Sequence, residues 1–262
     1  MHILTLKVGP KYSSAYVNNL YKSIRDNSTA PFQMHCYTDD MEGLDRQNIN
    51  IIQNPFMKYR LQWNKVEFHR EMFAGIMPGE QCLILDIDQL CIGDFDPILT
   101  HKLEEGQFGC FTRWWSRLQD VCRINGGFQM FRMGETDHLW QTFKSDPDWW
   151  SNYYIKRGEA FGKVNGEQNF IDNHVGDNRY YFPKEWFGKY NSDDMNVIQR
   201  QWFEECDPYE PFFIGGEFAS SLKLLHFASS HNIMHKQNIG IVRKYWEAHD
   251  WNAESYLRKD RQ

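Results

Sequence analysis

Apolar and polar stretches alternate along the first third of the chain in an order that predicts strands and helices in turn. Residues 2–8 form a short apolar run rich in β-forming residues, and residues 14–26 carry apolar side chains at helical spacing. Further strands are expected at 32–38 and 49–53, where polar residues end each run, and a helix is expected over 63–73. Strands that alternate with helices predict a mostly parallel sheet with short crossover connections.

The segment 82–92, CLILDIDQLCI, is an apolar run that closes on carboxylates. This pattern is typical of a strand buried on both faces that emerges at the edge of an α/β sheet, where ligands collect. In an extended segment Asp86 and Asp88 point the same way, so both carboxylates can bind one cation. Two such oxygen ligands favour Mg²⁺ or Mn²⁺ and a diphosphate substrate. The alternative is a pair of solvated acids in a loop, which the apolar residues before Asp86 disfavour.

The pattern becomes less regular after residue 105. Shorter strands are expected at 107–112 and 127–132, a helix near 136–144 and a last strand at 222–227. The chain shows no internal repeat, low-complexity tract or clear linker. We therefore interpret residues 1–262 as a single domain.

Charge and aromatic content narrow the class of ligand. The chain has 262 residues, of which 41% are hydrophobic, and a formal net charge of −6. Such a charge gives no polybasic attraction to nucleic acid or anionic lipid, so we expect a small ligand or a neutral polymer. Aromatic residues make up 16% of the chain, with 10 Trp, and flat rings beside polar groups suit sugars. For any single Trp, a place in the core is the more common explanation.

Cysteine usage indicates the compartment. The six cysteines form no CxxC pair, and several lie in apolar runs, which predicts reduced, buried thiols and no structural zinc. The first residues form too short an apolar run for a signal peptide, and no stretch approaches the ~20 apolar residues of a membrane span. We expect a cytoplasmic protein.

A third metal ligand is expected far from the aspartate pair. His226 ends the apolar run LKLLHF, and an imidazole nitrogen suits Mn²⁺ better than Mg²⁺. His231 and His235 lie near enough in the sequence to compete with it. A hydrogen-bonded structural histidine is the alternative interpretation of His226.

Two polar motifs supply further candidates. Gly126 and Gly127 allow a close backbone approach, and the Asn125 amide can reach a ligand hydroxyl, although a plain β-turn is equally compatible with these residues. Glu167 and Gln168 form a polar pair at the start of an expected helix, where helix capping is the alternative.

These segments, taken in order, resemble a GT-A-fold glycosyltransferase similar to glycosyltransferase family 8 and its bacterial and viral relatives. The resemblance implies an α/β, Rossmann-like fold in which a mostly parallel central sheet is flanked by helices. It also implies a nucleotide- and metal-binding half at 1–105 and a donor-sugar and acceptor half at 106–262. The segments that carry it are ILTLKVGPKYSSAYVNNLYKSI, HCYTDD, QWNKVEFH, LILDIDQLCIGDFDPI, INGGFQMF, GEQNFI and LLHF.

The resemblance assigns roles to individual residues. It implies that Asp86, Asp88 and His226 hold Mn²⁺, and that Asp88 and Gln168 act at the reaction centre. The family's Gly-Asp-Gln motif corresponds here to Gly166, Glu167 and Gln168, with Glu in place of Asp. The implied nucleotide-binding residues are Thr5, Lys7, Val8, Tyr12, Lys65, Asp86 and Ile87. The implied donor-sugar residues are Asn125, Gly126, Gly127, Glu167 and Gln168.

The sequence departs from the family after His226, where a Gly and then a Lys-Pro commonly bind phosphate. Here the chain runs HFASSHNIMHK. The candidates for binding the diphosphate are therefore His231, Lys236 and Lys65.

The predicted activity is transfer of a hexose from a nucleotide diphosphate sugar to a glycan or other hydroxyl acceptor, with retention at the anomeric carbon. The family's usual donor is a UDP-sugar, which implies UDP-glucose or UDP-galactose and Mn²⁺ or Mg²⁺. One alternative is a phosphatase of the haloacid-dehalogenase type, but that family expects Gly-Thr where Gln89-Leu90 follow the aspartate pair. Another is a non-catalytic carbohydrate- or nucleotide-sugar-binding protein on the same fold.

Overall fold

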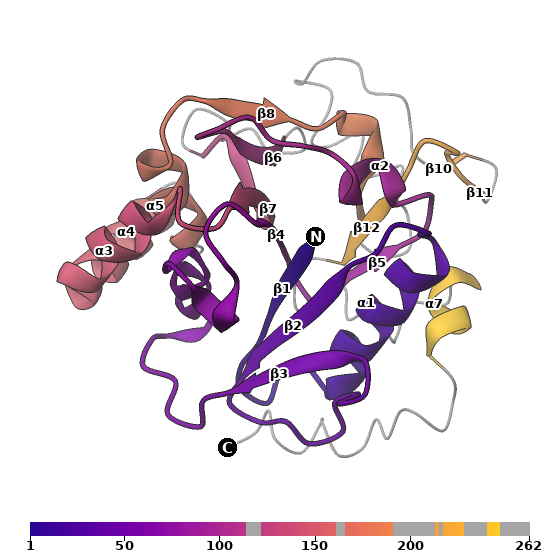
Figure 1. Cartoon of the computed structure of the whole chain (residues 1–262), viewed down its shortest axis with the longest axis horizontal. Helices are drawn as coiled ribbons and strands as arrows, with labels where there is room; N and C mark the ends of the chain where they lie inside the picture. The colour runs from indigo at the N-terminus through magenta and orange to yellow at the C-terminus, as the bar shows by residue number, and fades with distance from the viewer. Residues whose placement is uncertain (114–121, 161–165, 191–212, 215–216, 228–239, 247–262) are drawn as a thin grey trace.

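A seven-stranded sheet in the order β3-β2-β1-β4-β7-β6-β8 forms the centre of the molecule (Figure 1). The structure is a computed structural model that describes residues 1–113, 122–160, 166–190, 213–214, 217–227 and 240–246. In the central sheet only β7 runs antiparallel to its neighbours, so the predicted mostly parallel sheet is confirmed. Its strands are β1 (His2–Lys7), β2 (Gln33–Thr38), β3 (Ile49–Gln53), β4 (Gln81–Leu85), β6 (Phe108–Thr112), β7 (Ile124–Arg132) and β8 (Arg179–Tyr181).

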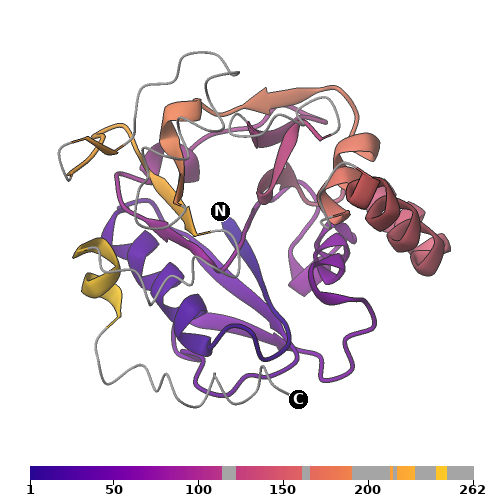
Figure 2. The ribbon, with the colours of Figure 1, turned by 180° about the vertical axis from the view of Figure 1, so that it is seen from behind.

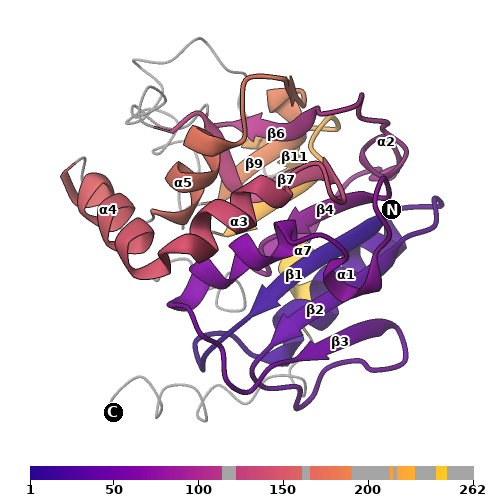
Figure 3. The ribbon, with the colours of Figure 1, turned by 60° about the vertical axis from the view of Figure 1, so that its left-hand side comes forward.

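Helical segments cover both faces of this sheet, which gives three layers (Figures 1 and 3). Alternate side chains of each strand point to opposite faces, so Ile3 and Leu83 pack in the core beneath α1, whereas Leu4 and Ile84 pack in the core beneath η1, α3 and α5. One face carries α1 (Ser14–Asp26), with α7 (Gly240–Tyr245) beside it. The other carries η1 (Leu61–His69), η2 (Phe73–Gly75), α3 (Asp137–Ser145) and α5 (Glu167–His174), with α4 (Pro147–Ala160) packed on α5. The view from behind shows the same separation (Figure 2).

A second, three-stranded sheet brings a strand from late in the chain, β12, to the middle of the molecule. Strand β12 (Leu224–Phe227) lies between β5 (Gln89–Cys91), to which it is antiparallel, and β9 (Phe187–Tyr190), to which it is parallel. The Phe227 amide donates to the Asp88 carbonyl at 2.8 Å, so β12 continues directly alongside the aspartate pair. The remaining elements are α2 (Asp96–Leu99), η3 (Lys184–Trp186) and the hairpin β10 (Phe213–Ile214) and β11 (Glu217–Phe218).

Two predicted elements differ from those observed. The strand expected before the aspartate pair is β4, but the extended segment expected at Asp86 and Asp88 is a turn, because the chain leaves β4 at Leu85 and re-enters as β5 in a different sheet. The expected helix 63–73 is the 3₁₀ segment η1 followed by η2, since Met72 and Ala74 take left-handed backbone angles that an α-helix does not accommodate. The other predicted strands and helices lie within a few residues of their expected bounds.

The Trp/Tyr-rich segment that follows α3 is helix α4. Trp150 and Tyr154 turn inward and pack on Phe170 of α5, whereas Trp149 and Tyr153 are exposed and stack on one another with ring centroids 5.2 Å apart. In the described residues no helix combines the length and apolar character needed to cross a membrane.

Candidate functional site

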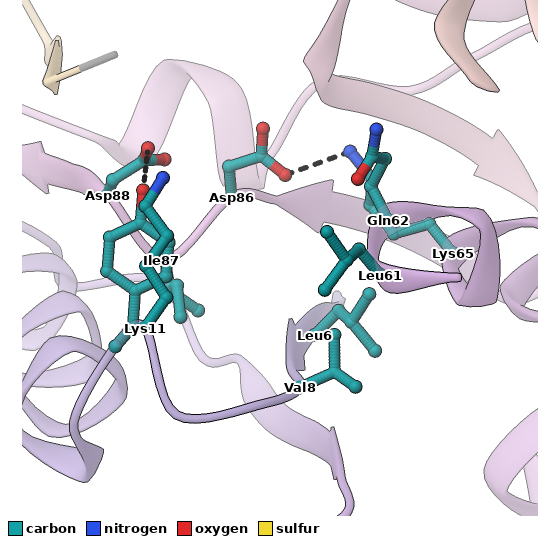
Figure 4. Close-up of a pocket in the computed structure, with 10 residues that line it drawn as sticks. Leu6, Val8, Lys11, Leu61, Gln62, Lys65, Asp86, Ile87 and Asp88 are labelled. Atoms are coloured by element: carbon teal, nitrogen blue, oxygen red, sulfur yellow. Dashed lines mark hydrogen bonds and ion pairs between the residues drawn. The ribbon is translucent and has the colours of Figure 1, made fainter. Parts of the chain in front are cut away.

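The candidate site lies at the carboxyl ends of two adjacent parallel strands, β1 and β4 (Figure 4). The chain leaves β1 toward α1 and β2 on one side, while β4 lies on the other, which is the arrangement that opens a ligand crevice in α/β sheets. A pocket of about 270 Å³ opens there, close to the lower end of ordinary ligand pockets at ~300 Å³. It is lined by Leu6, Val8, Lys11, Tyr12, Leu61, Gln62, Lys65, Asp86, Ile87 and Asp88.

Asp86, Asp88 and His226 come together at this pocket. One potential ligand atom from each lies within 4.8 Å of the other two. The His226 Nε2 is 3.2 Å from Asp88 Oδ1, and neighbouring ligands of an octahedral ion with bonds of ~2.1 Å are separated by roughly 3 Å. His226 Nδ1 is buried without a hydrogen-bond partner among the described residues. The donor set and its spacing fit a divalent cation.

The local structure explains how these three groups meet. Asp86 and Asp88 lie in the turn between β4 and β5 rather than in an extended strand, so a backbone turn, not strand alternation, makes the carboxylates converge. Pairing of His226 with Gln89 across β12 and β5 then places the imidazole beside Asp88. Burial raises the pKa of Asp88, but His226, the charge of Lys11 and the hydrogen bond from Tyr12 together outweigh it, and the net pKa is lowered.

Lys65 is buried beside the aspartate pair and contacts three acceptors. Its Nζ lies 3.0 Å from Asp86 Oδ1, 2.8 Å from Glu167 Oε1 and 3.2 Å from the Gly126 carbonyl oxygen. Burial lowers the pKa of this ammonium, whereas Asp86 and Glu167 raise it more strongly, so Lys65 is held charged. Burial raises the pKa of Glu167, and the charge and hydrogen bond of Lys65 oppose this rise without cancelling it.

Gly126 and Gly127 lie within strand β7, not in a β-turn. A Cβ on Gly127 would stand 2.6 Å from Asp86 Oδ2, and one on Gly126 would stand 2.6 Å from the Gln168 Cβ. Only glycine allows β7 to pass this close to both groups. The Asn125 side-chain oxygen accepts from the Gly127 amide at 3.1 Å, and its side-chain nitrogen is buried without a partner among the described residues.

The first turn of α5 carries Glu167 and Gln168 into the same site. Gln168 Oε1 accepts from the Gly126 amide at 3.2 Å, and the Glu167 carboxylate faces Lys65. Gly166 precedes them at a position where a Cβ would stand 2.7 Å from the backbone of Tyr154 in α4. The close packing of α4 on α5 therefore fixes where the helix begins.

A buried polar chain continues from Gly126 into the layer beneath. Its carbonyl oxygen also accepts from Gln129 Nε2 at 2.9 Å, and Gln129 Oε1 lies 3.2 Å from His69 Nε2. Because a carbonyl can only accept, the Gln129 amide nitrogen must face Gly126, so His69 Nε2 donates to Gln129. His69 Nδ1 then accepts from the Thr136 hydroxyl at 3.0 Å. Burial lowers the pKa of His69 to about 3, which keeps the ring neutral.

Several predicted residues lie away from the pocket lining or outside the described chain. The Thr5 hydroxyl donates to the Leu85 carbonyl at 2.9 Å and the Lys7 ammonium to the Asp40 carbonyl at 3.2 Å, on the opposite face of β1 from Leu6 and Val8. The nucleotide-binding roles of Thr5 and Lys7 stay predictions. Three further candidates for binding the metal or the diphosphate lie outside the described residues: His231, His235 and Lys236.

Other residues of the site were missed by the sequence analysis. Gln89 follows the aspartate pair directly and donates to the Gly127 carbonyl at 2.7 Å, and Gln129 is a glutamine within an otherwise apolar strand. A polar side chain in a buried strand was the available signal for both. Lys11 lies in the loop after β1 and Leu61 is the first residue of η1, and neither stands in a distinguishing pattern of the sequence.

Comparison with known proteins supports the fold. No family model and no curated protein sequence matches the chain. Solved structures do match. The galactosyltransferase LgtC, in complex with donor and acceptor sugar analogues, is 13% identical with a TM-score of 0.58, over 98% of this chain and 94% of LgtC.

Two further glycosyltransferases share the architecture over a smaller part of their own length. GlyE of Streptococcus pneumoniae is 11% identical, with a TM-score of 0.57, over 98% of this chain and 62% of GlyE. The bifunctional WbbM, in its apo structure, is 8% identical, with a TM-score of 0.57, over 93% of this chain and 48% of WbbM. At such identities the likeness establishes the fold, which is that of GT-A glycosyltransferases. Assignment to family 8 stays a prediction.

Proposed function

We propose that this protein is a metal-dependent glycosyltransferase that moves a hexose from a nucleotide diphosphate sugar to a hydroxyl group of a glycan or other acceptor. The observation that carries the proposal is the cluster of Asp86, Asp88 and His226 at a pocket between β1 and β4. The GT-A fold shared with LgtC supports it by analogy of fold.

Asp86, Asp88 and His226 would hold the cation, and two carboxylates with one imidazole favour Mn²⁺ over Mg²⁺. Such an ion, when bound, supplies Lewis-acid stabilisation of the negative charge on the departing diphosphate. The contribution of the chain is to hold Asp86 in place through Lys65 and to exclude a side chain at Gly127, which leaves room for the carboxylate.

The pocket walls suit the nucleotide. Leu6, Val8 and Leu61 gather on the side below Asp86 in Figure 4, and such apolar groups can cover a base or ribose, with the Tyr12 ring as a further face. The resemblance to family 8 implies UDP as the nucleotide. UDP-glucose or UDP-galactose is therefore the proposed donor.

The donor sugar is proposed to lie over Asn125 and the start of α5. The unpartnered Asn125 side-chain nitrogen can donate to a sugar hydroxyl, and Gln168 presents its amide at the same place. Retention at the anomeric carbon, with Gln168 near the reacting face, is proposed from the family resemblance. The acceptor would approach past α4, whose exposed Trp149 and Tyr153 offer flat rings to a glycan.

The proposed division of labour has the half 1–105 supplying the pocket lining and the half 106–262 supplying Asn125, Gln168 and His226. We also propose a cytoplasmic location. The five cysteines in the described residues are all free and buried, as expected in a reducing compartment.

The test is release of nucleotide from UDP-, GDP-, ADP- and CDP-sugars with Mn²⁺ present. The wild-type protein should turn over one class of donor, and Asp88→Asn should lower that turnover by about 100-fold or more. Asp94→Asn is the matched control, because Asp94 is exposed and asparagine keeps its bond to the Asp96 amide.

Equal turnover in Asp88→Asn would show that the cluster does not carry the reaction. Affinity for a nucleotide sugar without turnover would favour the non-catalytic binding protein on the same fold. A protein that binds none of the donors would refute the proposal.

A further inference from the structure

Two ammonium groups line the candidate pocket, and they differ in what surrounds them. Lys65 is 5% exposed and contacts Asp86, Glu167 and the Gly126 carbonyl oxygen. A lysine ammonium has three N–H donors. Two of them bond to Asp86 and the Gly126 carbonyl oxygen, and the charge is paired with Glu167 at 2.8 Å, so this buried ammonium is held by acceptors of the protein itself.

Lys11 lies on the opposite side of the aspartate pair. It belongs to the loop after β1 and is exposed; the structure records no ion pair of direct contact for it in the described part of the chain, although its charge helps to lower the pKa of Asp88. Its Nζ lies 4.6 Å from the centre of the Tyr12 ring, and the Tyr12 hydroxyl donates to Asp88 Oδ2 at 3.2 Å. Figure 4 shows Lys11 beneath Asp88 and Lys65 beyond Asp86.

The charges at the site indicate what Lys11 can bind. A divalent cation would be neutralised by Asp86 and Asp88, and the Lys65 charge is opposed by Glu167. The two phosphates of a nucleotide sugar each carry a negative charge and enter beside the cation. Lys11 is the remaining positive side chain among the described residues that line the pocket.

We propose that Lys11 binds the diphosphate of the nucleotide donor, as a positive charge at the rim of the site next to Asp88. The inference rests on the proposed function and names a binding residue for it. The cation–π contact with Tyr12 restricts the positions of a long, flexible side chain, which lowers the entropy lost when the ammonium engages a phosphate oxygen.

The experiment is calorimetric titration of UDP and uridine into the wild-type protein with Mn²⁺, with ADP, GDP and CDP and their nucleosides as further pairs. The variants are Lys11→Met, Lys11→Arg and Lys22→Met. Lys22 is an exposed lysine of α1 that does not line the pocket, so Lys22→Met removes the same charge elsewhere. Titration of Mn²⁺ alone into each variant reports the metal site separately.

Lys11→Met should weaken binding of the nucleoside diphosphate about tenfold at low salt, while binding of the nucleoside stays the same and binding of Mn²⁺ alone is not weakened. The difference in diphosphate affinity between Lys11→Met and the wild type should become smaller at ~0.5 M salt, because the ammonium is exposed and its charge is screened. Lys11→Arg should restore most of the affinity, and Lys22→Met should match the wild type.

Unchanged affinity for the diphosphate in Lys11→Met, with a wild-type protein that binds it, would overturn the assignment of Lys11 alone. An equal loss of affinity for the nucleoside and the nucleoside diphosphate would also overturn it, since the effect would then come from contacts of the Tyr12 ring with the nucleoside. A wild-type protein that binds no nucleotide in the panel would overturn the proposed function and this inference together.

Discussion

Replacement of Lys65 by methionine isolates the energetics of the buried charges beneath the candidate site. The ammonium lies 2.8 Å from Glu167 and 3.0 Å from Asp86, and the side chains of Lys65 and Glu167 are 6% and 1% exposed. Methionine preserves most of the aliphatic volume and removes the charge. Glu167 is then left as a buried carboxylate without its cation, whereas Asp86 still reaches solvent through a side chain that is 29% exposed.

Removing one partner of a buried ion pair costs about 3–5 kcal/mol. For a domain of this size each kcal/mol lowers Tm by ~2–4 °C, so Lys65→Met should melt on the order of 10 °C below the wild type at pH 8. Adding Glu167→Gln removes the stranded charge, and the double variant should recover most of the loss. Glu167→Gln alone should destabilise the protein less than Lys65→Met does, because Lys65 keeps its ion pair with Asp86.

The pH dependence of this loss follows from the pKa of Glu167. Burial raises the pKa of this carboxyl in the folded protein, and without Lys65 only the Gln168 backbone amide opposes that rise, while the charge of Asp86 adds to it. The folded variant therefore binds a proton more tightly than the unfolded chain does. The loss of stability is small below about pH 4.3, where both states are protonated, and grows by up to ~1.4 kcal/mol per pH unit above it.

Thermal and urea denaturation of the four proteins at pH 5 and pH 8 measure these differences. The free energy of unfolding of Lys65→Met should lie closer to that of the wild type at pH 5 than at pH 8. The double variant should show no such dependence on pH. A loss below ~1 kcal/mol, or one that is independent of pH, would refute the view that Lys65 and Glu167 form a buried ion pair.

Three further outcomes are expected. In Gly127→Ala the new Cβ would stand 2.6 Å from Asp86 Oδ2, so the carboxylate must move. Calorimetry should therefore show an Mn²⁺ affinity lowered at least ~10-fold. An unchanged Mn²⁺ affinity would contradict the close approach of β7 to Asp86. Burial lowers the pKa of His69 to about 3, so below pH ~6.5 the unfolded chain binds a proton at this residue and the folded protein does not. The free energy of unfolding should therefore fall as the pH drops from ~6.5. His69→Gln should flatten this decline in urea titrations, and identical slopes would count against it. Trp63→Ala, which removes a 1% exposed ring stacked on Phe143 at 5.3 Å, should cost about 3–5 kcal/mol in urea denaturation, and a loss below 1 kcal/mol would show that the cavity collapses.

The N-terminal strands could be predicted because their burial on both faces demands near-continuous apolar runs. The apolar stretch that ends at Asp86 belongs to β4, the innermost parallel strand beside β1, and its polar termination marks the edge of the sheet. The approximate place of the aspartate pair followed from that termination alone.

The geometry at the pair could not be predicted in the same way. A strand and a turn both allow two carboxylates to converge, and the choice between them depends on β5 joining a different sheet from β4. The orientation of β7 is likewise a tertiary property. Its residues Gly126 and Gly127 were equally compatible with a turn until the approach of Asp86 and Gln168 was known.

Contacts of single polar side chains were the least predictable part of the site. Lys65 and Lys11 are both lysines near apolar residues, yet one is enclosed by three acceptors and the other is exposed. His69 and Gln129 meet across two elements that are distant in the sequence. Hydrogen bonds of this kind depend on distances that a periodic pattern does not encode.

The delivery of His226 by β12 has a consequence for how the protein matures. About half of the chain separates this histidine from Asp88, and the strand that carries it pairs with β5 only once the intervening segments have been made. Pairings over such long separations form late because loop closure must precede them. During synthesis on the ribosome, a nascent chain that already contains both aspartates would lack the third ligand, so a complete cation site would arise only after β12 has been synthesised and has paired with β5.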